Sequence, residues 1–228
     1  MDLNLADKDA AWVSQFLASR RTTRDFLPTP VAPEIINQIL KDSLTAPSWS
    51  NTRPFKVAVA TGEVRDRISN EFLARWHVLS KIMRKGFKNK LRLIFTRYGL
   101  PTSNRSIVKP YVAELKPRAE RVGRELYTLF GVARGDRDAR DKQWGKNYEF
   151  FGAPVELFVY IHKSLHIYAA SDAGLMMENL ILKLSRLLIM RPLLYPTVCH
   201  LQLFLLDDQN ILKLHFQNQK LCRYLKST

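Results

Sequence analysis

Apolar residues recur at helical spacing in two stretches near the N-terminus. Residues 10–19, AAWVSQFLAS, predict a short helix. Residues 33–45 predict a second helix, because apolar side chains repeat at intervals of about one turn from Ile36 to Leu44. Pro33 suits the first position of that helix, where its missing N–H costs nothing.

Two other stretches are apolar and rich in β-branched residues. Residues 55–61, FKVAVAT, and residues 153–162, APVELFVYIH, predict buried strands. Gly62 is expected to end the first of them, and a long polar helix is expected to follow from Glu63.

The pattern returns to helical spacing in the second half of the chain. Residues 120–133, ERVGRELYTLFGVA, and residues 170–185, ASDAGLMMENLILKLS, predict two further helices. Residues 201–216 predict a hairpin whose turn lies at residues 207–210. Residues 98–110 are expected to form a loop.

A strongly basic segment lies at residues 81–97, with seven Lys or Arg residues and no acidic one. The favoured interpretation is the solvated face of a helix with an apolar underside. A surface for nucleic acid or for a membrane remains the alternative.

The bulk composition limits the function only loosely. A chain of 228 residues with 46% apolar residues suits one globular domain with a sizeable core, or a compact domain with an appendage. The net charge of +15 permits attraction to phosphate in nucleic acid, in membranes or in a cofactor, and identifies none of them.

The sequence gives no sign of export, membrane insertion or metal binding. No secretory signal and no run of 18 apolar residues is visible, so no membrane partner is expected. Cys199 and Cys222 lack the spacing of metal ligands or of a redox pair, which favours a reducing cytoplasm. The five histidines show no metal-ligand arrangement, so no metal site is expected.

Two polar segments carry candidate chemistry. In the first, SRRTTRDF at residues 19–26, the forked side chains of Arg20, Arg21 and Arg24 suit phosphate or carboxylate. Taken alone, the segment is more simply a basic helix terminus that complements the helix dipole.

The second segment, APSWSNTRPF at residues 46–55, places Ser48, Ser50 and Asn51 between two stiffening prolines. The Asn51 amide can both donate and accept, which suits the edge of a heterocycle. Taken alone, this segment is more simply a turn between a helix and a strand.

Together, and at this spacing, the two segments resemble the flavin-dependent nitroreductase family. Three further segments agree with its nitrobenzoate-reductase-like branch: LYTLFGVARGDRDAR at 126–140, NYEFFGAPVELFVYI at 147–161 and SDAGLMMENLIL at 171–182. The resemblance extends from residue 16 to about residue 182.

The resemblance implies an α+β fold, a three-layer α/β/α sandwich around a mainly antiparallel sheet. It also implies FMN bound without a covalent link in an intertwined homodimer. The phosphate and ribityl chain would then be held by Arg20, Arg21 and Thr22. Arg24 would lie toward the flavin ring and stabilise its reduced, anionic form. The Pro47–Asn51 loop would approach the flavin, often from the partner subunit.

The implied reaction is ping-pong, from NAD(P)H through FMN to a nitroaromatic, a quinone or a related small-molecule acceptor. Because the flavin carries the chemistry, no catalytic side chain is expected. No dinucleotide fingerprint decides between NADH and NADPH. The expected cofactor-binding residues are Arg20, Arg21, Thr22, Arg24, Pro47, Ser48, Trp49, Ser50, Asn51 and Arg53.

The sequence also departs from the family. Arg53 stands where the family usually has Gln, Phe55 where it has Trp, and Glu178 where it has Gln. The family pattern is lost near Lys183, and no glycine follows Gly174.

We therefore expect a nitroreductase-like domain at residues 1–182 and an atypical segment at residues 183–228, frameshifted or truncated relative to the family. The alternative functions are an inactive or flavin-deficient remnant and, less favoured, a basic nucleic-acid-binding protein.

Overall fold

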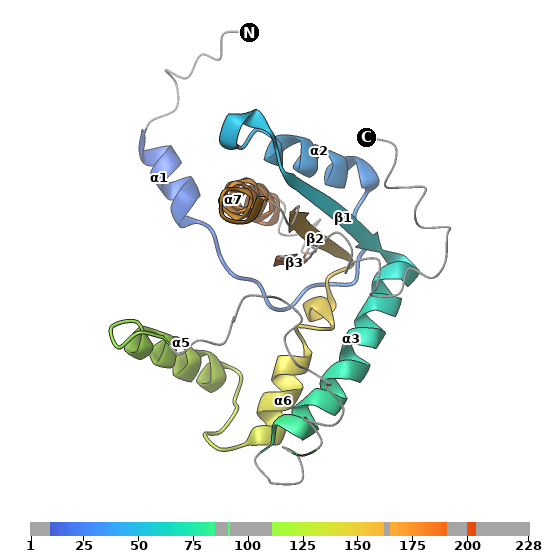
Figure 1. The fold of residues 1–228 in the computed structure, drawn as a ribbon, viewed down its shortest axis with the longest axis vertical. Helices are drawn as coiled ribbons and strands as arrows, with labels where there is room; N and C mark the ends of the chain where they lie inside the picture. Colours follow the sequence, from blue (N-terminus) through green and yellow to red (C-terminus); the bar gives the residue numbers. More distant parts are fainter. Residues whose placement is uncertain (1–9, 85–90, 92–110, 162–164, 191–199, 204–228) are drawn as a thin grey trace. The chain divides into compact units, whose positions relative to one another are not determined.

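The computed structural model describes residues 10–84, 91, 111–161, 165–190 and 200–203, drawn in colour in Figure 1. The chain divides into two compact units. The first unit comprises Met1–Asp66 and Phe151–Thr228, and the second comprises Arg67–Phe150. The second unit is therefore an insertion in the sequence of the first.

The first unit contains a three-stranded sheet in the order β1-β2-β3. β1 (Phe55–Thr61) pairs with β2 (Val155–Ile161) in antiparallel fashion, with Phe55 opposite Ile161. β3 (His200–Leu203) pairs with β2 in parallel. Both strands predicted from apolar runs are confirmed, and Gly62 follows the first as expected because it has a positive φ of 52°.

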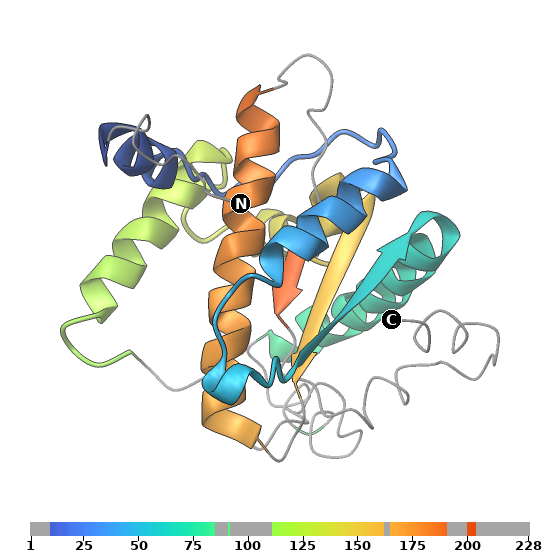
Figure 2. The same cartoon turned by 90° about the horizontal axis from the view of Figure 1, so that it is seen from above.

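The core of the first unit lies between this sheet and two helices, α2 (Pro33–Ser43) and α7 (His166–Met190). α7 contacts α2, β2 and β1 (Figures 1 and 2). Its small residue Ala173 and its larger residues Met176 and Leu180 are all at most 1% exposed. The core also includes Ile39, Phe55, Val155, Leu157, Val159, Ile161, Ala169 and Leu184.

β2 is buried on both faces. Its odd-numbered residues, from Val155 to Ile161, face the core described above. Glu156 and Tyr160 point to the opposite face, as alternation along a strand requires, and are 0% and 9% exposed. This double burial explains the nearly continuous apolar sequence of β2 and suits the middle layer of a sandwich. Helices and an antiparallel strand pair thus occur together, which confirms the expected α+β class.

The two helices predicted near the N-terminus are confirmed, within two residues at their ends. α1 spans Ala10–Ala18, and the rings of Trp12 and Phe16 stack with centroids 5.5 Å apart. α2 begins at Pro33 as predicted, and its last residue Ser43 donates a hydrogen bond of 2.7 Å to the carbonyl of Ile39.

α3 (Gly62–Met83) follows β1 directly, as expected, and continues into the second unit. The second unit also contains α5 (Lys116–Leu129), α6 (Arg137–Gly145) and the short turn η3 (Phe150–Gly152), whose last two residues lie in the first unit. The helix predicted over 120–133 therefore starts earlier and ends earlier, because Pro117 suits a first turn and Gly131 has a positive φ of 66°.

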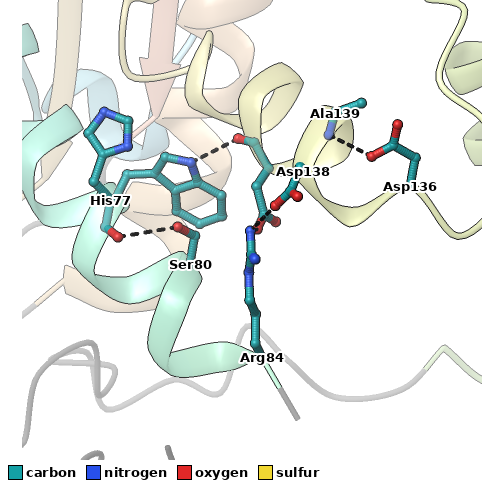
Figure 3. A network of polar contacts seen from close by, with 8 residues as sticks. His77, Ser80, Arg84, Asp136, Asp138 and Ala139 are labelled. Carbon is teal, nitrogen blue, oxygen red and sulfur yellow. Dashed lines mark hydrogen bonds and ion pairs between the residues drawn. The ribbon is translucent and has the colours of Figure 1, made fainter.

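Polar contacts join α3 to α6 within the second unit (Figure 3). The Asp136 side chain caps α6 by accepting a 2.9 Å hydrogen bond from the Ala139 amide. Arg84, just past the end of α3, forms ion pairs with Asp138 and Asp141 of α6. The Trp76 indole donates to the Asp141 carbonyl at 3.0 Å.

Other predictions fall partly or wholly outside the described residues. α7 is longer than the helix predicted over 170–185 at both ends. Of the hairpin predicted at 201–216, the structure describes β3 alone, and the loop predicted at 98–110 lies almost wholly in the undescribed part. Most of the basic segment at 81–97 lies there too. None of the helices in the described ranges combines the length and apolar character needed to cross a membrane.

Candidate functional site

The segment between α2 and β1 forms a tight turn with unusual backbone geometry. Its centre, η2, spans Trp49–Asn51. Ser50, Asn51 and Arg53 have positive φ values of 51°, 52° and 46°. Asn adopts this left-handed conformation readily, whereas Ser and Arg adopt it at a free-energy cost. We call residues 47–53 the η2 loop.

Hydrogen bonds within the η2 loop hold this conformation. The backbone N–H of Arg53 donates to the Ser48 hydroxyl at 2.9 Å, and the backbone N–H of Asn51 donates to the Ser48 carbonyl at 2.9 Å. The Thr52 hydroxyl donates to the Trp49 carbonyl, also at 2.9 Å. Ser48 therefore closes the turn through both its side chain and its backbone.

The η2 loop is also attached to the first turns of α7. The Trp49 amide donates a 3.1 Å hydrogen bond to Oδ2 of Asp172, a carboxylate that is only 6% exposed. The rings of Trp49 and Tyr168 lie 4.7 Å apart at 33°. In the sequence Asp172 stands out only as part of a helix motif, and Tyr168 does not stand out at all. No local signal predicted either contact, because both residues lie more than 100 positions from the loop.

The predicted binding side chains of the η2 loop are accessible. Pro47, Ser50, Asn51 and Arg53 are exposed, and Trp49 is 63% exposed. Ser48 alone is half-buried, because its hydroxyl serves the turn itself. The loop therefore presents polar and aromatic groups on a fixed backbone.

The arginine-rich segment follows α1 as an extended stretch. Arg20 donates to the Thr22 hydroxyl at 3.4 Å, and Arg21 donates to the carbonyls of Ala18 and Arg20 at 2.6 and 2.9 Å. Arg21 thus neutralises part of the carbonyl end of α1, the simpler role foreseen for this segment. Arg20, Arg21, Thr22 and Arg24 are all exposed. Among the described residues, none of the three guanidinium groups is paired with a carboxylate.

Two residues after Arg24 the same segment is fixed to the chain before β2. The Phe26 amide donates to the Phe151 carbonyl at 3.0 Å. Phe151 and Gly152 have positive φ values of 51° and 81°, and a Cβ on Gly152 would lie 3.1 Å from the Phe26 carbonyl oxygen. A glycine is needed here both for its backbone conformation and for this close approach.

The structure does not bring the two predicted loops together within one chain. In Figure 2 the η2 loop lies beside the N-terminal part of α7, whereas the segment between α1 and α2 lies at the level of its C-terminal half. Across the described ranges, no hydrogen bond, ion pair or ring contact joins them. Each loop is formed and accessible, but one chain does not build a single site from both.

Other polar groups of the first unit serve the packing of its helices. Lys183 of α7 pairs with Asp42 of α2, and this hydrogen bond holds the pKa of Asp42 below its ordinary value. Gln38 donates to the same carboxylate at 2.7 Å. The part of the chain that the structure describes holds no group of three or more His, Cys, Asp or Glu side chains placed to bind a metal.

Comparison with known proteins adds to this geometry. A sequence model of the nitroreductase family matches residues 17–187, more than half of the chain. The 4-nitrobenzoate reductase of Pseudomonas putida is 30% identical over 168 residues, which are 73% of this chain and 64% of that protein. The nitrobenzene nitroreductase of Ectopseudomonas oleovorans is 26% identical over 171 residues, 75% of this chain and 68% of that protein. The chain thus spans less than two thirds of the first of these relatives.

Solved structures show the same likeness. The FMN and NADPH-dependent nitroreductase NfnB from Sphigopyxis sp. strain HMH is 28% identical with a TM-score of 0.58, over 76% of this chain and 70% of that chain. The NfnB of Mycobacterium smegmatis shares the fold with a TM-score of 0.61, at 24% identity over 78% of this chain and 72% of that chain. The family match includes the arginine-rich segment, the η2 loop and most of α7. The chain therefore belongs to the nitroreductase family.

Proposed function

We propose that this protein is an FMN-dependent oxidoreductase that takes electrons from NAD(P)H and passes them to a nitroaromatic, a quinone or a related acceptor. The observation that carries the proposal is the η2 loop, an accessible turn of strained backbone fixed to α7. Strained backbone of this kind gathers at ligand-binding sites. Family membership and the 4-nitrobenzoate reductase and NfnB relatives support the chemical class.

The residues present fit FMN. Its phosphate needs cationic and hydroxyl donors, and the arginine-rich segment offers exposed guanidinium groups that no described carboxylate neutralises. Its ring edge needs paired donors and acceptors, which the side-chain amide of Asn51 and the hydroxyl of Ser50 supply from an exposed turn. Bound FMN would supply two-electron redox chemistry between the nicotinamide donor and the acceptor.

In this proposal each of the candidate cofactor-binding residues has a binding or an electrostatic task. Arg20, Arg21 and Thr22 hold the phosphate and ribityl chain. Arg24 places a positive charge near the ring, where a preorganised cation stabilises negative charge without reorganisation. Pro47, Ser48, Trp49, Ser50, Asn51 and Arg53 form the wall that the η2 loop presents.

The active form is proposed to be a homodimer. The support is the separation of the two loops along α7 in one chain (Figure 2), because a site that needs both must take one of them from a second copy. The cytoplasm is the proposed location, since the reaction draws on NAD(P)H and the two cysteines lack the spacing of a redox pair.

The test begins with the absorption spectrum of the purified full chain after FMN is added and the excess is removed. Retained flavin close to one per chain, followed by oxidation of NADPH or NADH in the presence of 4-nitrobenzoate, would support the proposal. Loss of a charge-assisted contact in Arg20→Ala should raise the Kd for FMN about ten-fold or more. Arg118→Ala is the matched control, because Arg118 is an exposed arginine of α5 in the second unit.

Four results would contradict the proposal. A chain that retains no FMN would be a flavin-deficient remnant, and a flavin-loaded chain without turnover would be an inactive one. Equal effects of Arg20→Ala and Arg118→Ala would show general electrostatic attraction instead of a phosphate site. Strongly salt-dependent binding to DNA or RNA in a chain that ignores FMN would favour the nucleic-acid alternative.

A further inference from the structure

We infer that α7 positions the cofactor loop, with the buried carboxylate of Asp172 as the central positioning residue and Tyr168 as its aromatic support. This inference rests on the proposed FMN site and deepens it. Neither residue is assigned to bind the cofactor directly. Both act through Trp49 on the conformation of the η2 loop.

The η2 loop requires support from outside itself. Three of its residues without the freedom of glycine, Ser50, Asn51 and Arg53, have φ values between 46° and 52°. This left-handed conformation is unfavourable for Ser50 and Arg53, whereas Asn adopts it readily, and it persists when surrounding contacts over-determine it. The hydrogen bonds inside the loop involve short polar groups at an exposed surface, where water competes for the same donors and acceptors.

Asp172 supplies the contact that water competes with least. Its side chain is 6% exposed, and its Oδ2 lies 3.1 Å from the Trp49 amide. A hydrogen bond to a charged acceptor in a buried position is stronger than one between neutral groups at the surface. Trp49 is the first residue of η2, so this bond fixes the backbone immediately before the left-handed pair Ser50 and Asn51.

Tyr168 holds the Trp49 side chain one turn earlier on the same helix. The two rings are 4.7 Å apart, although Trp49 is 63% and Tyr168 60% exposed. Tyr168 and Asp172 are four residues apart and therefore lie on one face of α7. The backbone and the side chain of Trp49 are thus both held by this face of the helix.

The arrangement has a functional consequence for binding. A loop already fixed in its binding conformation avoids the ordering cost that a loose loop would have to meet on binding. Removing the support should therefore weaken FMN binding even though every side chain of the arginine-rich segment and the η2 loop is still present.

The experiment measures the Kd for FMN of the full chain in Asp172→Ala, Asp172→Asn and Tyr168→Ala. Asp172→Ala should raise the Kd about ten-fold, because a hydrogen bond to a charged acceptor is lost. Asp172→Asn keeps an oxygen that can accept from the Trp49 amide, so it should restore binding to within about three-fold of the wild type. Tyr168→Ala should weaken binding without disturbing the core, and Tyr168→Phe, which keeps the ring, should not.

Asp42→Ala is the matched control, since Asp42 also links α7 to a neighbouring element of the first unit and lies outside both loops. It should lower stability and leave the Kd unchanged. Hydrogen exchange of peptides covering residues 47–54 in the absence of FMN gives a readout that does not need the cofactor. Exchange there should be faster in Asp172→Ala and in Tyr168→Ala than in Asp42→Ala.

The outcomes separate this inference from the proposed function. If the wild type binds FMN and Asp172→Ala and Tyr168→Ala bind it equally well, the positioning role is wrong and the proposed function stands. A Kd that rises as much in Asp42→Ala as in Asp172→Ala reduces the role to general stability and overturns the inference. A wild type that binds no FMN overturns the proposed function and this inference with it. Weakened binding with rescue by Asp172→Asn supports both.

Discussion

Gly152 occupies a position where backbone conformation and space both exclude a side chain. Its φ is +81°, and it follows Phe150 and Phe151, whose φ values of 55° and 51° are also left-handed. A Cβ at this position would meet the Phe26 carbonyl oxygen at 3.1 Å. The segment that carries the arginines is fixed here, because the Phe26 amide bonds to Phe151.

Gly152→Ala should lower the free energy of unfolding by about 1–3 kcal/mol, since the new side chain strains the backbone and crowds a carbonyl. Denaturant titration measures the change. Gly123→Ala is the opposite case, because Gly123 lies inside α5 and an added methyl group would have nothing within 4 Å. It should raise stability by about 0.5–1 kcal/mol. Equal effects of the two substitutions would refute the role given to Gly152.

Substitution of Arg20 should change the Kd for FMN, whereas substitution of Arg24 should change kcat. In the proposed site Arg20 holds the phosphate, so Arg20→Ala should weaken FMN retention and leave turnover of the FMN-saturated enzyme nearly unchanged. Arg24 acts near the ring, so Arg24→Ala should lower kcat by about ten-fold or more even at saturating FMN. Steady-state kinetics at several FMN concentrations distinguish the two. Identical behaviour of both variants would argue against separate roles.

The candidate residues at this scale were predictable only in part. Arg20, Arg21, Arg24 and the η2 loop are contiguous in sequence, so their polar character and spacing were visible directly. The contact of Trp49 with Asp172 spans 123 positions, and no local pattern encodes such a pairing. The left-handed conformations of Ser50 and Arg53 were also invisible, because neither residue type favours them.

Among the elements, α2 and α7 are joined by a polar seam at one side of the core. Lys183 pairs with Asp42, and Asn179 donates to the Thr45 hydroxyl at 3.4 Å. The side chains of Lys183 and Asp42 are 37% and 34% exposed, so solvent screens the pair. The seam joins two helices whose apolar residues share one core with β2.

The ion pair between Asp42 and Lys183 should make the free energy of unfolding depend on pH in the acidic range. Its hydrogen bond from Lys183 lowers the folded pKa of Asp42 below the ordinary value of 3.8. The contribution is therefore complete above that value and is lost as the pH falls through the folded pKa. As the pH falls from about 5 to about 2, the free energy of unfolding should decrease less in Asp42→Asn than in the wild type. The difference between the two decreases should be about 0.5 kcal/mol, because the pair is screened by solvent.

Unfolding by urea across this pH range measures the difference. Glu34→Gln serves as the control, because it removes an exposed carboxylate from the first turn of the same helix. The Asp42 assignment is wrong if Glu34→Gln and Asp42→Asn change the acid dependence equally.

A second pair of elements, α3 and α6, is held by Arg84. Its ion pairs with Asp138 and Asp141 raise its pKa further, the hydrogen bond to Asp138 being the larger cause (Figure 3). Arg84→Ala should speed hydrogen exchange in residues 137–145, because α6 loses a tie to α3. Arg75→Ala, an exposed arginine on the same helix, should not. Unchanged exchange in both variants would show that Trp76 and the Asp136 cap suffice.

Hydrophobic periodicity predicted whether most of these elements are helices or strands. It predicted the residues at which they begin and end less accurately. α1, α2, β1 and β2 match the sequence because apolar spacing and β-branched content are local signals. α7 extends beyond the predicted range, to His166 and Met190, because local apolar spacing does not mark the exact ends of a helix. The parallel pairing of β3 with β2 was not predicted, since a short apolar run carries no information on its partner.

At the scale of the whole molecule, the net charge of +15 comes from several basic segments. The arginine-rich segment presents charge that no described carboxylate pairs with, whereas Arg84, just past the end of α3, and Lys116 of α5 take part in ion pairs. Much of the basic segment at 81–97 lies outside the described residues, so its two interpretations remain predictions.

FMN should stabilise the folded chain by mass action. At a concentration about 100 times its Kd, a ligand that binds only the folded state adds about 2.7 kcal/mol. For a chain of this size that amount should raise Tm by about 5–10 °C. Differential scanning fluorimetry with tryptophan emission tests this, with riboflavin, which lacks the phosphate, as the control ligand. An equal increase in Tm with riboflavin would contradict the proposal that the arginine-rich segment binds the phosphate of FMN.

The separation of the two halves of the first unit along the chain has a consequence for how the protein is made. β1 and its antiparallel partner β2 are separated in the sequence by residues 62–154, although Thr61 lies opposite Val155 in the sheet. A ribosome adds about 5–20 residues per second, so β1 emerges roughly 5–20 s before β2 exists. During that interval an apolar strand is present without its sheet, while the helices of the second unit, which lie within residues 67–150, are being made and find their partners. We expect nascent chains of this protein to depend on a chaperone that shields β1 until translation has passed residue 161.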